Sequence, residues 1–255
     1  MGSWTGAAGR GRRRAPLTVV QVADDFDDAI RLLRDYSGAD ADLAGVILEV
    51  VRVTGASVST MGFLAEETIS ASDRSVARLD EAQFDLGEGP CWDAVSTGAP
   101  VSLPDLRAAP ARWPALEAML RSEPIGAVHA FPMLVGSLAM GALDLYHVEP
   151  YELDDVETRQ AAAIAEVLGR HVLRRALVRV VDREPPRDDS PFSRRIVHQA
   201  TGFVVGQLGV SVDEATLLIQ GMAFSTDRSM REVGQDILNG SRRFEVRENM
   251  IEDER

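Results

Sequence analysis

Apolar residues recur at helical spacing in three short segments between residues 190 and 241. Each segment has one apolar stripe with a repeat of about three to four residues, which is typical of a helix with a single buried face. Because such helices bury their stripes against one another, the pattern predicts a compact bundle. The stripes are Ile196, Ala200, Phe203 and Val204, then Ala215, Leu218, Ile219 and Met222, then Met230, Val233 and Ile237.

Serine residues mark the start of each helix predicted in this bundle. Ser190-Pro191 combines an N-cap with proline at the first helical position. Ser211–Glu214 and Ser229–Glu232 have the spacing of a capping box, in which each side chain accepts a hydrogen bond from the other residue's backbone N–H. Asn239-Gly240 provides a left-handed stop for the third helix.

The N-terminal half alternates between helical and strand-like patterns. Two amphipathic helices are expected between residues 24 and 53. Strand-like alternation follows at Ser57–Leu64 and Glu67–Ala71, and a mixed segment without a clear period leads to Phe84. The two glycines and the proline of Gly87–Pro90 then predict a turn that enters a short helix.

A hairpin is predicted further along the chain. Ala127–Val135 and Met140–His147 are apolar strands on either side of Gly136-Ser137, and the second alternates as a half-buried strand does. A short helix that ends at Arg121 is expected before the hairpin. The order of elements predicts an α+β fold in which helices flank an antiparallel sheet.

Leu153–Val181 is predicted to form one long helix. Its apolar set is wider than a coiled-coil seam, and it includes Ile164, Leu168 and Val172. We interpret this set as an interface between the long helices of two chains. The alternative is that the helix packs on the sheet of its own chain.

Composition fits a globular chain. Of the 255 residues, 45% are hydrophobic and 26% are charged. The apolar runs are too short for a membrane span, the N-terminus has no secretory signal pattern, and the single cysteine fits a reducing compartment. We therefore expect a cytoplasmic protein without a membrane contact. The net charge of −13 argues against a surface that binds nucleic acid everywhere, although a local basic patch is compatible with it.

We find no catalytic or metal-binding pattern, and we expect neither enzyme activity nor a cofactor. The four histidines are scattered without ligand spacing. Cys91 follows Pro90 at a helix start, where a thiolate is favoured, so it is a redox candidate; the alternative is a buried small apolar residue. If a ligand pocket exists, we expect its lining to include Phe63, Phe84, Trp92, Trp113, Phe131 and Met133.

The C-terminal segments resemble the ANTAR domain, a three-helix RNA-binding module of bacterial transcription antitermination regulators. The residues that carry the resemblance are Arg195-Ile196, Gln199-Ala200, Gly202, Gly209, Asp213-Glu214-Ala215, Leu218, Met222-Ala223 and Met230–Val233. The resemblance implies recognition of single-stranded RNA loops.

The first helix of this module has a polar face beside its apolar stripe. Spacings of four, three and four place Arg195, Gln199, Gly202 and Gly206 on one side. Arginine can hold a phosphate, glutamine can bond a base edge, and glycine lets a backbone approach closely. The RNA-binding residues that we predict are Arg195, His198, Gln199, Thr201, Gly202 and Arg231. The alternative for the two glycines is that they admit a neighbouring helix.

The N-terminal part resembles a GAF domain of the actinobacterial type that precedes an ANTAR domain. The resemblance rests on Gly87–Cys91, Arg112–Pro114 and the closing hairpin. It implies a small-molecule sensor. The predicted divisions are an Arg-rich tail at 1–21, the sensor at 22–152, the long helix at 153–182, a polar linker at 183–189, the ANTAR bundle at 190–241 and a charged tail at 242–255.

The sequence departs from the ANTAR pattern at three points. Ala200-Thr201-Gly202 replaces the usual Ala-Lys-Gly, Ile219–Met222 lacks the usual arginines, and Val233-Gly234 replaces Val-Ala. Each lost phosphate contact weakens binding. Our hypothesis is a homodimeric regulator that binds RNA hairpin loops to control transcription termination.

Two other hypotheses remain. In the first, the chain is a ligand- or redox-sensing dimeric interaction protein whose bundle no longer binds RNA, as its near-neutral charge would favour. In the second, it is a DNA-binding regulator, but the short helices include no basic recognition helix.

Overall fold

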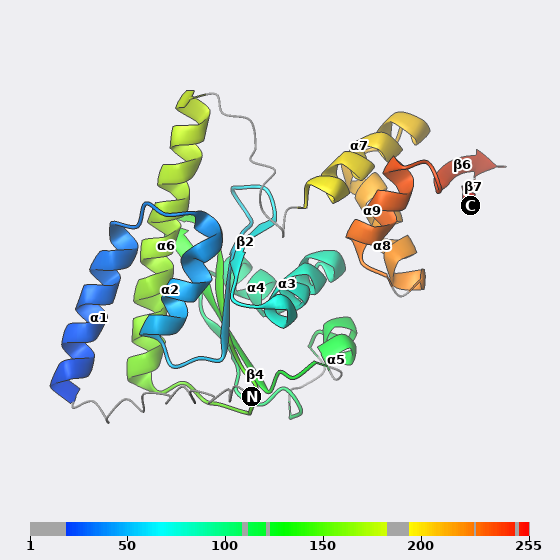
Figure 1. Cartoon of the computed structure of the whole chain (residues 1–255). Helices are drawn as coiled ribbons and strands as arrows, with labels where there is room; N and C mark the ends of the chain where they lie inside the picture. The colour runs from blue at the N-terminus through cyan, green and yellow to red at the C-terminus, as the bar shows by residue number, and fades with distance from the viewer. Residues whose placement is uncertain are drawn as a thin grey trace, which may run out of the picture.

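The computed structural model describes residues 19–108, 112–120, 123–182, 194–226, 228–247 and 250–254. Its N-terminal part is a sheet with helices on both faces, and its C-terminal part is a helical bundle that lies beside α3 (Figure 1). This confirms the predicted α+β class. The predicted polar linker and the Ser190-Pro191 cap lie outside the described residues.

The sheet has five antiparallel strands in the order β2-β1-β5-β4-β3. The predicted hairpin is confirmed as β4 and β5, with Gly136 at a φ of 63° in its turn. Strand β2 has the predicted bounds, and β1 is shorter than expected. The strands are β1 Gly55–Thr60, β2 Glu67–Ala71, β3 Val101–Leu103, β4 Ala127–Val135 and β5 Leu138–His147.

One face of the sheet is apolar and is covered by α2 Leu43–Val50 and α6 Asp155–Asp182, with a 3₁₀ turn at Asp40–Asp42, and α1 Val19–Arg34 packs on the outside of these helices (Figure 1). Alternate residues of the strands point to this face, as the period of two requires. They form one core with the helices and include Val58, Phe131, Met133, Leu143 and Leu145.

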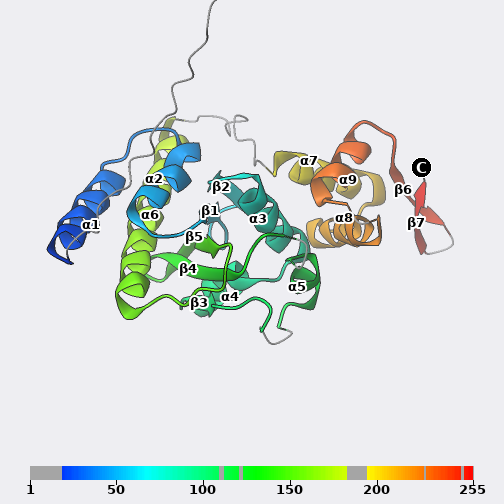
Figure 2. The ribbon, with the colours of Figure 1, turned by 60° about the horizontal axis from the view of Figure 1, so that its bottom comes forward.

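The opposite face is covered by α3 Arg74–Leu86, α4 Pro90–Thr97 and α5 Pro114–Leu120 (Figure 2). Helix α3 occupies the segment for which the sequence predicted no regular element. Asp73 caps it by accepting hydrogen bonds from the N–H groups of Ser75 and Val76. Val76, Leu79 and later apolar positions form its buried stripe, a signal that the intervening polar residues concealed.

Helix α6 packs on the sheet of its own chain, which corrects our preferred interpretation of its apolar face. Ile164, Leu168 and Val172 are buried against the strands, so they do not form an interface with another chain. The helix is apolar over a wide arc because it lies against both the sheet and α1. Large apolar side chains of α6 are exposed only near its two ends, with Val156 51%, Leu177 56% and Val178 50% exposed among the described residues.

The three predicted bundle helices are present as α7 Arg195–Leu208, α8 Val212–Thr226 and α9 Met230–Leu238. Both capping boxes form, at Ser211–Glu214 and Ser229–Glu232. The stop after α9 has its left-handed residue at Gly240, while the preceding asparagine stays right-handed.

The buried stripe of α7 differs from the prediction by a fraction of a turn. Val197, Ala200, Thr201 and Val204 are buried, whereas Phe203 is 43% exposed. Gly234 explains the close packing of α7 on α9, because a Cβ at this position would lie 3.2 Å from the side chain of Ile196.

The segment predicted as a charged tail contains a hairpin of β6 Arg243–Arg247 and β7 Met250–Glu254. Phe244 is 4% exposed and joins the bundle core, which anchors the first strand. Among the described residues, no single helix is long and apolar enough to cross a membrane; α7 and α8, bent by 112°, meet that test only as a pair.

Candidate ligand site and RNA interface

A cluster of buried polar side chains lies between the sheet and helices α3 and α4. We call it the polar cluster. Asp80 of α3 is its centre: one carboxylate oxygen accepts a hydrogen bond from Ser57 at 2.8 Å, and the other accepts bonds from Thr68 at 2.8 Å and from Ser59. The cluster consists of Ser57, Ser59, Thr68, Asp80, Gln83, Asp144 and Tyr146.

Asp144 of β5 is the second carboxyl group of the polar cluster. Its Oδ2 accepts hydrogen bonds from Gln83 at 2.8 Å and from Tyr146 at 3.1 Å. Its Oδ1 is buried and has no hydrogen-bond partner among the described residues. Of the four carboxyl oxygens of Asp80 and Asp144, this is the one without a partner among the described residues.

Burial and the neighbouring Asp80 raise the pKa of Asp144 to about 8. Burial also raises the pKa of Asp80, although its hydroxyl partners oppose that shift. Two carboxyl groups so close in an apolar surrounding do not both ionise readily. The Asp144 carboxyl is therefore largely protonated at neutral pH, and a cationic or hydrogen-bond-donating group placed beside it would favour its ionised form.

The glycine-rich turn after α3 holds this cluster together. Gln83 accepts a hydrogen bond from the N–H of Cys91 at 3.0 Å, which joins α3 to the start of α4. Gly89 permits this because it has a φ of 140° and a Cβ there would lie 2.5 Å from Gln83 Oε1. Glu88 accepts bonds from the N–H groups of Ala115 and Leu116 and so caps α5.

The bundle presents a different kind of surface on α7. Arg195, His198, Gln199 and Gly202 are all exposed on one side of the helix, and Phe203 lies at its edge. A Cβ added to Gly202 or to Gly206 would meet nothing within 4 Å. No described helix therefore packs on these glycines, which rules out, within the described chain, the alternative that they admit a neighbouring helix.

Family models match both parts of the chain. The GAF domain model matches residues 41–172, just over half of the chain, and the ANTAR domain model matches residues 192–238. The chain belongs to the GAF domain family. It also contains an ANTAR domain, an RNA-binding antitermination domain, so the two predicted modules are confirmed.

Solved structures share the GAF architecture. The chain resembles the GAF domain of an Acinetobacter phosphoenolpyruvate-protein phosphotransferase at 10% identity and a TM-score of 0.49, covering 64% of this chain and 98% of that chain. It also resembles a free methionine-R-sulfoxide reductase from Neisseria meningitidis at 14% identity and a TM-score of 0.48, covering 65% and 97%. No curated protein matches the chain.

The six residues predicted to line one ligand pocket do not converge in the GAF domain. Phe131 and Met133 belong to the core on the α6 face, Trp113 packs under α5, and Phe63 is 62% exposed. Phe84 and Trp92 meet edge to face on the opposite side of the sheet, with ring centroids 6.3 Å apart. The predicted pocket is wrong because the set combined residues from both sides of the sheet: Phe131 and Met133 of β4 point to the α6 face, whereas Phe84, Trp92 and Trp113 lie on the α3–α5 face.

Cys91 does not fit the redox role. Its thiol is 1% exposed, and burial together with Asp144 and Asp80 raises its pKa. Reactive thiols need access and a lowered pKa. The alternative interpretation, a buried small residue, describes it: Cys91 packs with Met61, Phe84 and Ala142.

His129 and His147 form a buried pair with ring centroids 5.9 Å apart. Burial, and for His129 also the neighbouring histidine, lowers the pKa of each, that of His129 to about 4. Both are therefore neutral side chains of the inner strands β4 and β5. No group of three or more metal-ligating side chains occurs in the part of the chain that the structure describes.

Thr201 must be removed from the predicted RNA-binding set. It is 5% exposed, and its hydroxyl donates a hydrogen bond to the backbone oxygen of Val197 inside α7. The lysine expected at this position in the family is long enough to reach the surface, whereas threonine is not. The remaining members, Arg195, His198, Gln199, Gly202 and Arg231, are exposed or partly exposed.

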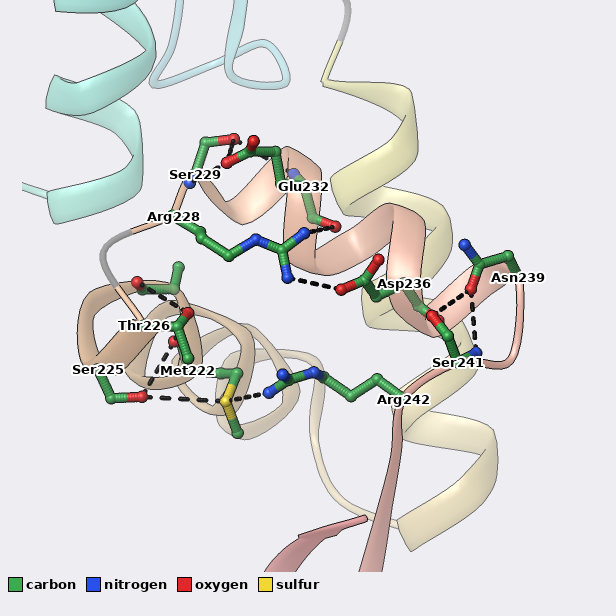
Figure 3. Close-up of polar contacts among 11 residues, drawn as sticks. Met222, Ser225, Thr226, Arg228, Ser229, Glu232, Asp236, Asn239, Ser241 and Arg242 are labelled. Atoms are coloured by element: carbon green, nitrogen blue, oxygen red, sulfur yellow. Dashed lines mark hydrogen bonds and ion pairs between the residues drawn. The ribbon is translucent and has the colours of Figure 1, made fainter. Parts of the chain in front are cut away.

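Internal contacts use other arginines of the ANTAR domain. Arg228 donates to Asp236 at 2.6 Å and to the backbone oxygen of Glu232 at 3.3 Å, which ties the α8–α9 loop to α9 (Figure 3). Arg242 reaches the sulfur of Met222 from the strand side (Figure 3). Arg228 thus stabilises the bundle, so its charge adds little to an RNA surface.

Sequence reasoning placed Phe203 wrongly and assigned no role to Arg194. Phe203 was assigned to the core, yet its exposed ring borders the polar face of α7. Arg194 lies one residue before α7, is 7% exposed, and pairs with Asp85 of the GAF domain at 2.8 Å. No local pattern identifies Arg194, because its partner is more than a hundred residues away in the sequence.

Proposed function

We propose that this chain is a signal-responsive regulator that binds RNA hairpin loops through its ANTAR domain and thereby controls transcription termination in the cytoplasm. The observation that supports the RNA-binding part is the open face of α7, where Arg195, Gln199 and Gly202 are exposed and no described residue packs on Gly202 or Gly206. Such a surface lets an RNA backbone approach closely, while Phe203 offers a ring on which an unpaired base can stack.

The GAF domain supplies the signal in this proposal. The polar cluster is the feature of the GAF domain best suited to a small molecule, because buried carboxyl groups there retain one unpartnered oxygen at Asp144. An uncompensated buried acceptor favours a ligand that donates a hydrogen bond or carries a positive charge. Its binding would ionise Asp144 and change the contacts of α3.

The test of RNA binding is a selection from a pool of RNAs that carry two adjacent hairpins with randomised loops. We expect the full chain to enrich a loop sequence, and we expect binding to the enriched RNA to weaken as salt rises. Arg195→Ala and Gln199→Ala should each lower the affinity by about tenfold, because each removes a phosphate or base contact.

Arg170→Ala is the matched control, since it removes an exposed arginine of α6 in the GAF domain. It should leave the affinity unchanged. Unchanged affinity in both Arg195→Ala and Gln199→Ala would disprove the site, and the absence of any enriched RNA would disprove the function.

A second function is favoured by the apolar surface of α8. Leu217 and Phe224 are 63% and 72% exposed, which is unusual for a surface that contacts only water and suits a protein partner. The chain would then be a dimeric interaction protein that no longer binds RNA. Light scattering of the chain and of its Leu217→Ser and Phe224→Ser variants distinguishes the two functions. The second function would be favoured if the chain is a dimer, if these variants are monomers, and if the RNA selection enriches no sequence.

A further inference from the structure

Helix α3 of the GAF domain connects the polar cluster with the ANTAR domain. Asp80 and Gln83 point inward and hold the polar cluster, as described above. Asp85, in the last turn of α3, points outward to the bundle. A shift of α3 that accommodates a ligand in the cluster would therefore move Asp85 as well, because a helix turn is stiff over such a short length.

The Asp85 carboxylate is held by two groups of the ANTAR domain. Its Oδ1 accepts a hydrogen bond from Nη1 of Arg194 at 2.8 Å, and its Oδ2 accepts one from the N–H of Met230 at 2.7 Å. Gln220 of α8 donates to the backbone oxygen of Asp85 at 2.8 Å. The guanidinium group of Arg194 also lies over the Phe84 ring, 5.3 Å from its centroid.

The two ANTAR groups that hold Asp85 make a receptor for an oxyanion. Met230 is the first residue of α9, where N–H groups lack partners within the helix and the helix dipole favours negative charge. Arg194 contributes a planar guanidinium group, whose fork of N–H donors can bind either a carboxylate or a phosphate. Its Nε is buried and has no hydrogen-bond partner among the described residues, so the fork has a donor left for a further oxygen.

The Asp85 carboxylate is desolvated where it meets the ANTAR domain. Burial raises the pKa of Asp85, and the charge of Arg194 and the N–H of Met230 offset that effect only in part. The cost of burying the ionised carboxylate is therefore only partly compensated by its partners. A better anion can displace it.

We propose that Arg194 and the first N–H of α9 form a binding site for a phosphate of the RNA backbone, and that Asp85 of the GAF domain occupies this site in competition with RNA. The inference rests on the proposed function. Arg194 immediately precedes Arg195, the first residue of the polar face of α7, so one RNA strand that contacts Gln199 can extend to it. The GAF domain then limits RNA binding by covering a phosphate contact, and a signal that moves α3 uncovers it.

The experiment compares RNA binding by full-length variants, using two-hairpin RNAs enriched in parallel by the chain and by its Asp85→Ala variant. Asp85→Ala should raise the affinity about tenfold, which corresponds to about 1.4 kcal/mol of differential binding. Glu49→Ala, at an exposed acidic residue on α2, removes the same charge on the other side of the sheet and should change the affinity little. An equal gain in both variants, or no gain in Asp85→Ala, would overturn the competition.

The phosphate contact is tested by Arg194→Gln in the Asp85→Ala background. We expect the tenfold gain to be lost and the slope of log affinity against log salt to fall by about one. Arg52→Gln is the matched arginine control, at an exposed position of the GAF domain. A retained gain with an unchanged salt slope would overturn the phosphate site.

Arg194→Lys decides the question if Arg194→Gln does not fold, as circular dichroism would show. Lysine keeps the charge but not the fork, so we expect a loss of about threefold or more, whereas unchanged affinity would overturn the site. If no variant enriches any RNA, both the proposed function and this inference fail. If the chain and Asp85→Ala enrich RNA with equal affinity, only the inference fails.

Discussion

In the GAF domain, the functional polar groups are buried beneath α3 and α4 and bond one another, whereas in the ANTAR domain they lie on the exposed face of α7. Asp80 is 1% exposed and accepts hydrogen bonds from the hydroxyl groups of Ser57, Ser59, Thr68 and Tyr146, while Gln199 is exposed and Gly202 faces open space. A buried cluster suits a small ligand that is enclosed on binding. An open face suits a macromolecule. The difference predicts that substitutions in the cluster act first on stability, and substitutions on α7 act first on binding.

The largest expected effect is that of Asp80→Ala. It leaves the hydroxyl groups of Ser57, Ser59 and Thr68 without their shared acceptor in a buried site, which should lower the free energy of unfolding of the GAF domain by about 3 kcal/mol. Thermal unfolding followed by circular dichroism measures the change. Asp35→Ala, at an exposed position after α1, is the control and should change stability by less than about 0.5 kcal/mol. Equal effects would show that the cluster does not stabilise the domain.

Gly234→Val tests the packing of the ANTAR bundle with a smaller expected effect. A Cβ at this position would lie 3.2 Å from the side chain of Ile196 and 3.3 Å from that of Ala200, so the larger valine side chain must push α7 away from α9. The bundle should lose about 2 kcal/mol of stability, measured by denaturant unfolding. If only the unfolding transition of the GAF domain changed, this account of the α7–α9 packing would be contradicted.

The pH dependence of GAF stability should be smaller than either of these effects when it is counted per pH unit. The pKa of Asp144 is raised on folding, so the folded domain binds a proton that the unfolded chain releases near its ordinary value of about 4. Its contribution to stability is complete below that value and is lost as pH rises towards about 8. The free energy of unfolding should fall by at most about 1.4 kcal/mol per pH unit in this window. Asp144→Asn should reduce the slope of stability against pH and leave only the part due to Asp80. An unchanged slope would show that the pKa of Asp144 is not raised on folding.

Gly202→Ala separates stability from binding within one variant. The added methyl group of alanine would point into open space, and alanine favours a helix interior over glycine. The free energy of unfolding of the bundle, measured with denaturant, should therefore rise by about 0.5 to 1 kcal/mol. Affinity for an enriched RNA should nevertheless fall, because the methyl group holds the RNA backbone away from α7. A stabilised variant with unchanged affinity would remove Gly202 from the interface.

The local elements could be predicted wherever the pattern was strong. The β4–β5 hairpin has alternating apolar residues around Gly136-Ser137, and α8 and α9 begin with complete capping boxes. Helix α3 was missed because polar residues interrupt its apolar stripe, and several of them, such as Asp80 and Gln83, are buried for a reason that only the sheet supplies. The C-terminal hairpin was missed because its residues are mostly charged.

The exposed polar side of α7, which we propose as the RNA-binding face, was also largely predictable, because residues three and four apart share a helix face. The prediction placed Thr201 on the surface and Phe203 in the core, and the structure has the reverse. A shift of one residue rotates an apolar stripe by about 100°, and only the packing partners of the helix decide which stripe is buried. The polar cluster, our candidate ligand site, was not predictable, because its members come from β1, β2, α3 and β5 and none of them has a spacing signature.

The sequence by itself determined the two modules, their order, most of their helices and strands, and the polar residues of α7, because these depend on periodicity and capping between near neighbours. The tertiary structure alone decided that α6 packs on its own sheet, that Cys91 is enclosed, that Asp80 and Asp144 share one buried cluster, and that Asp85 meets Arg194. These contacts join residues that are distant in the chain. Burial and pairing depend on what lies opposite a side chain, which a one-dimensional pattern does not contain.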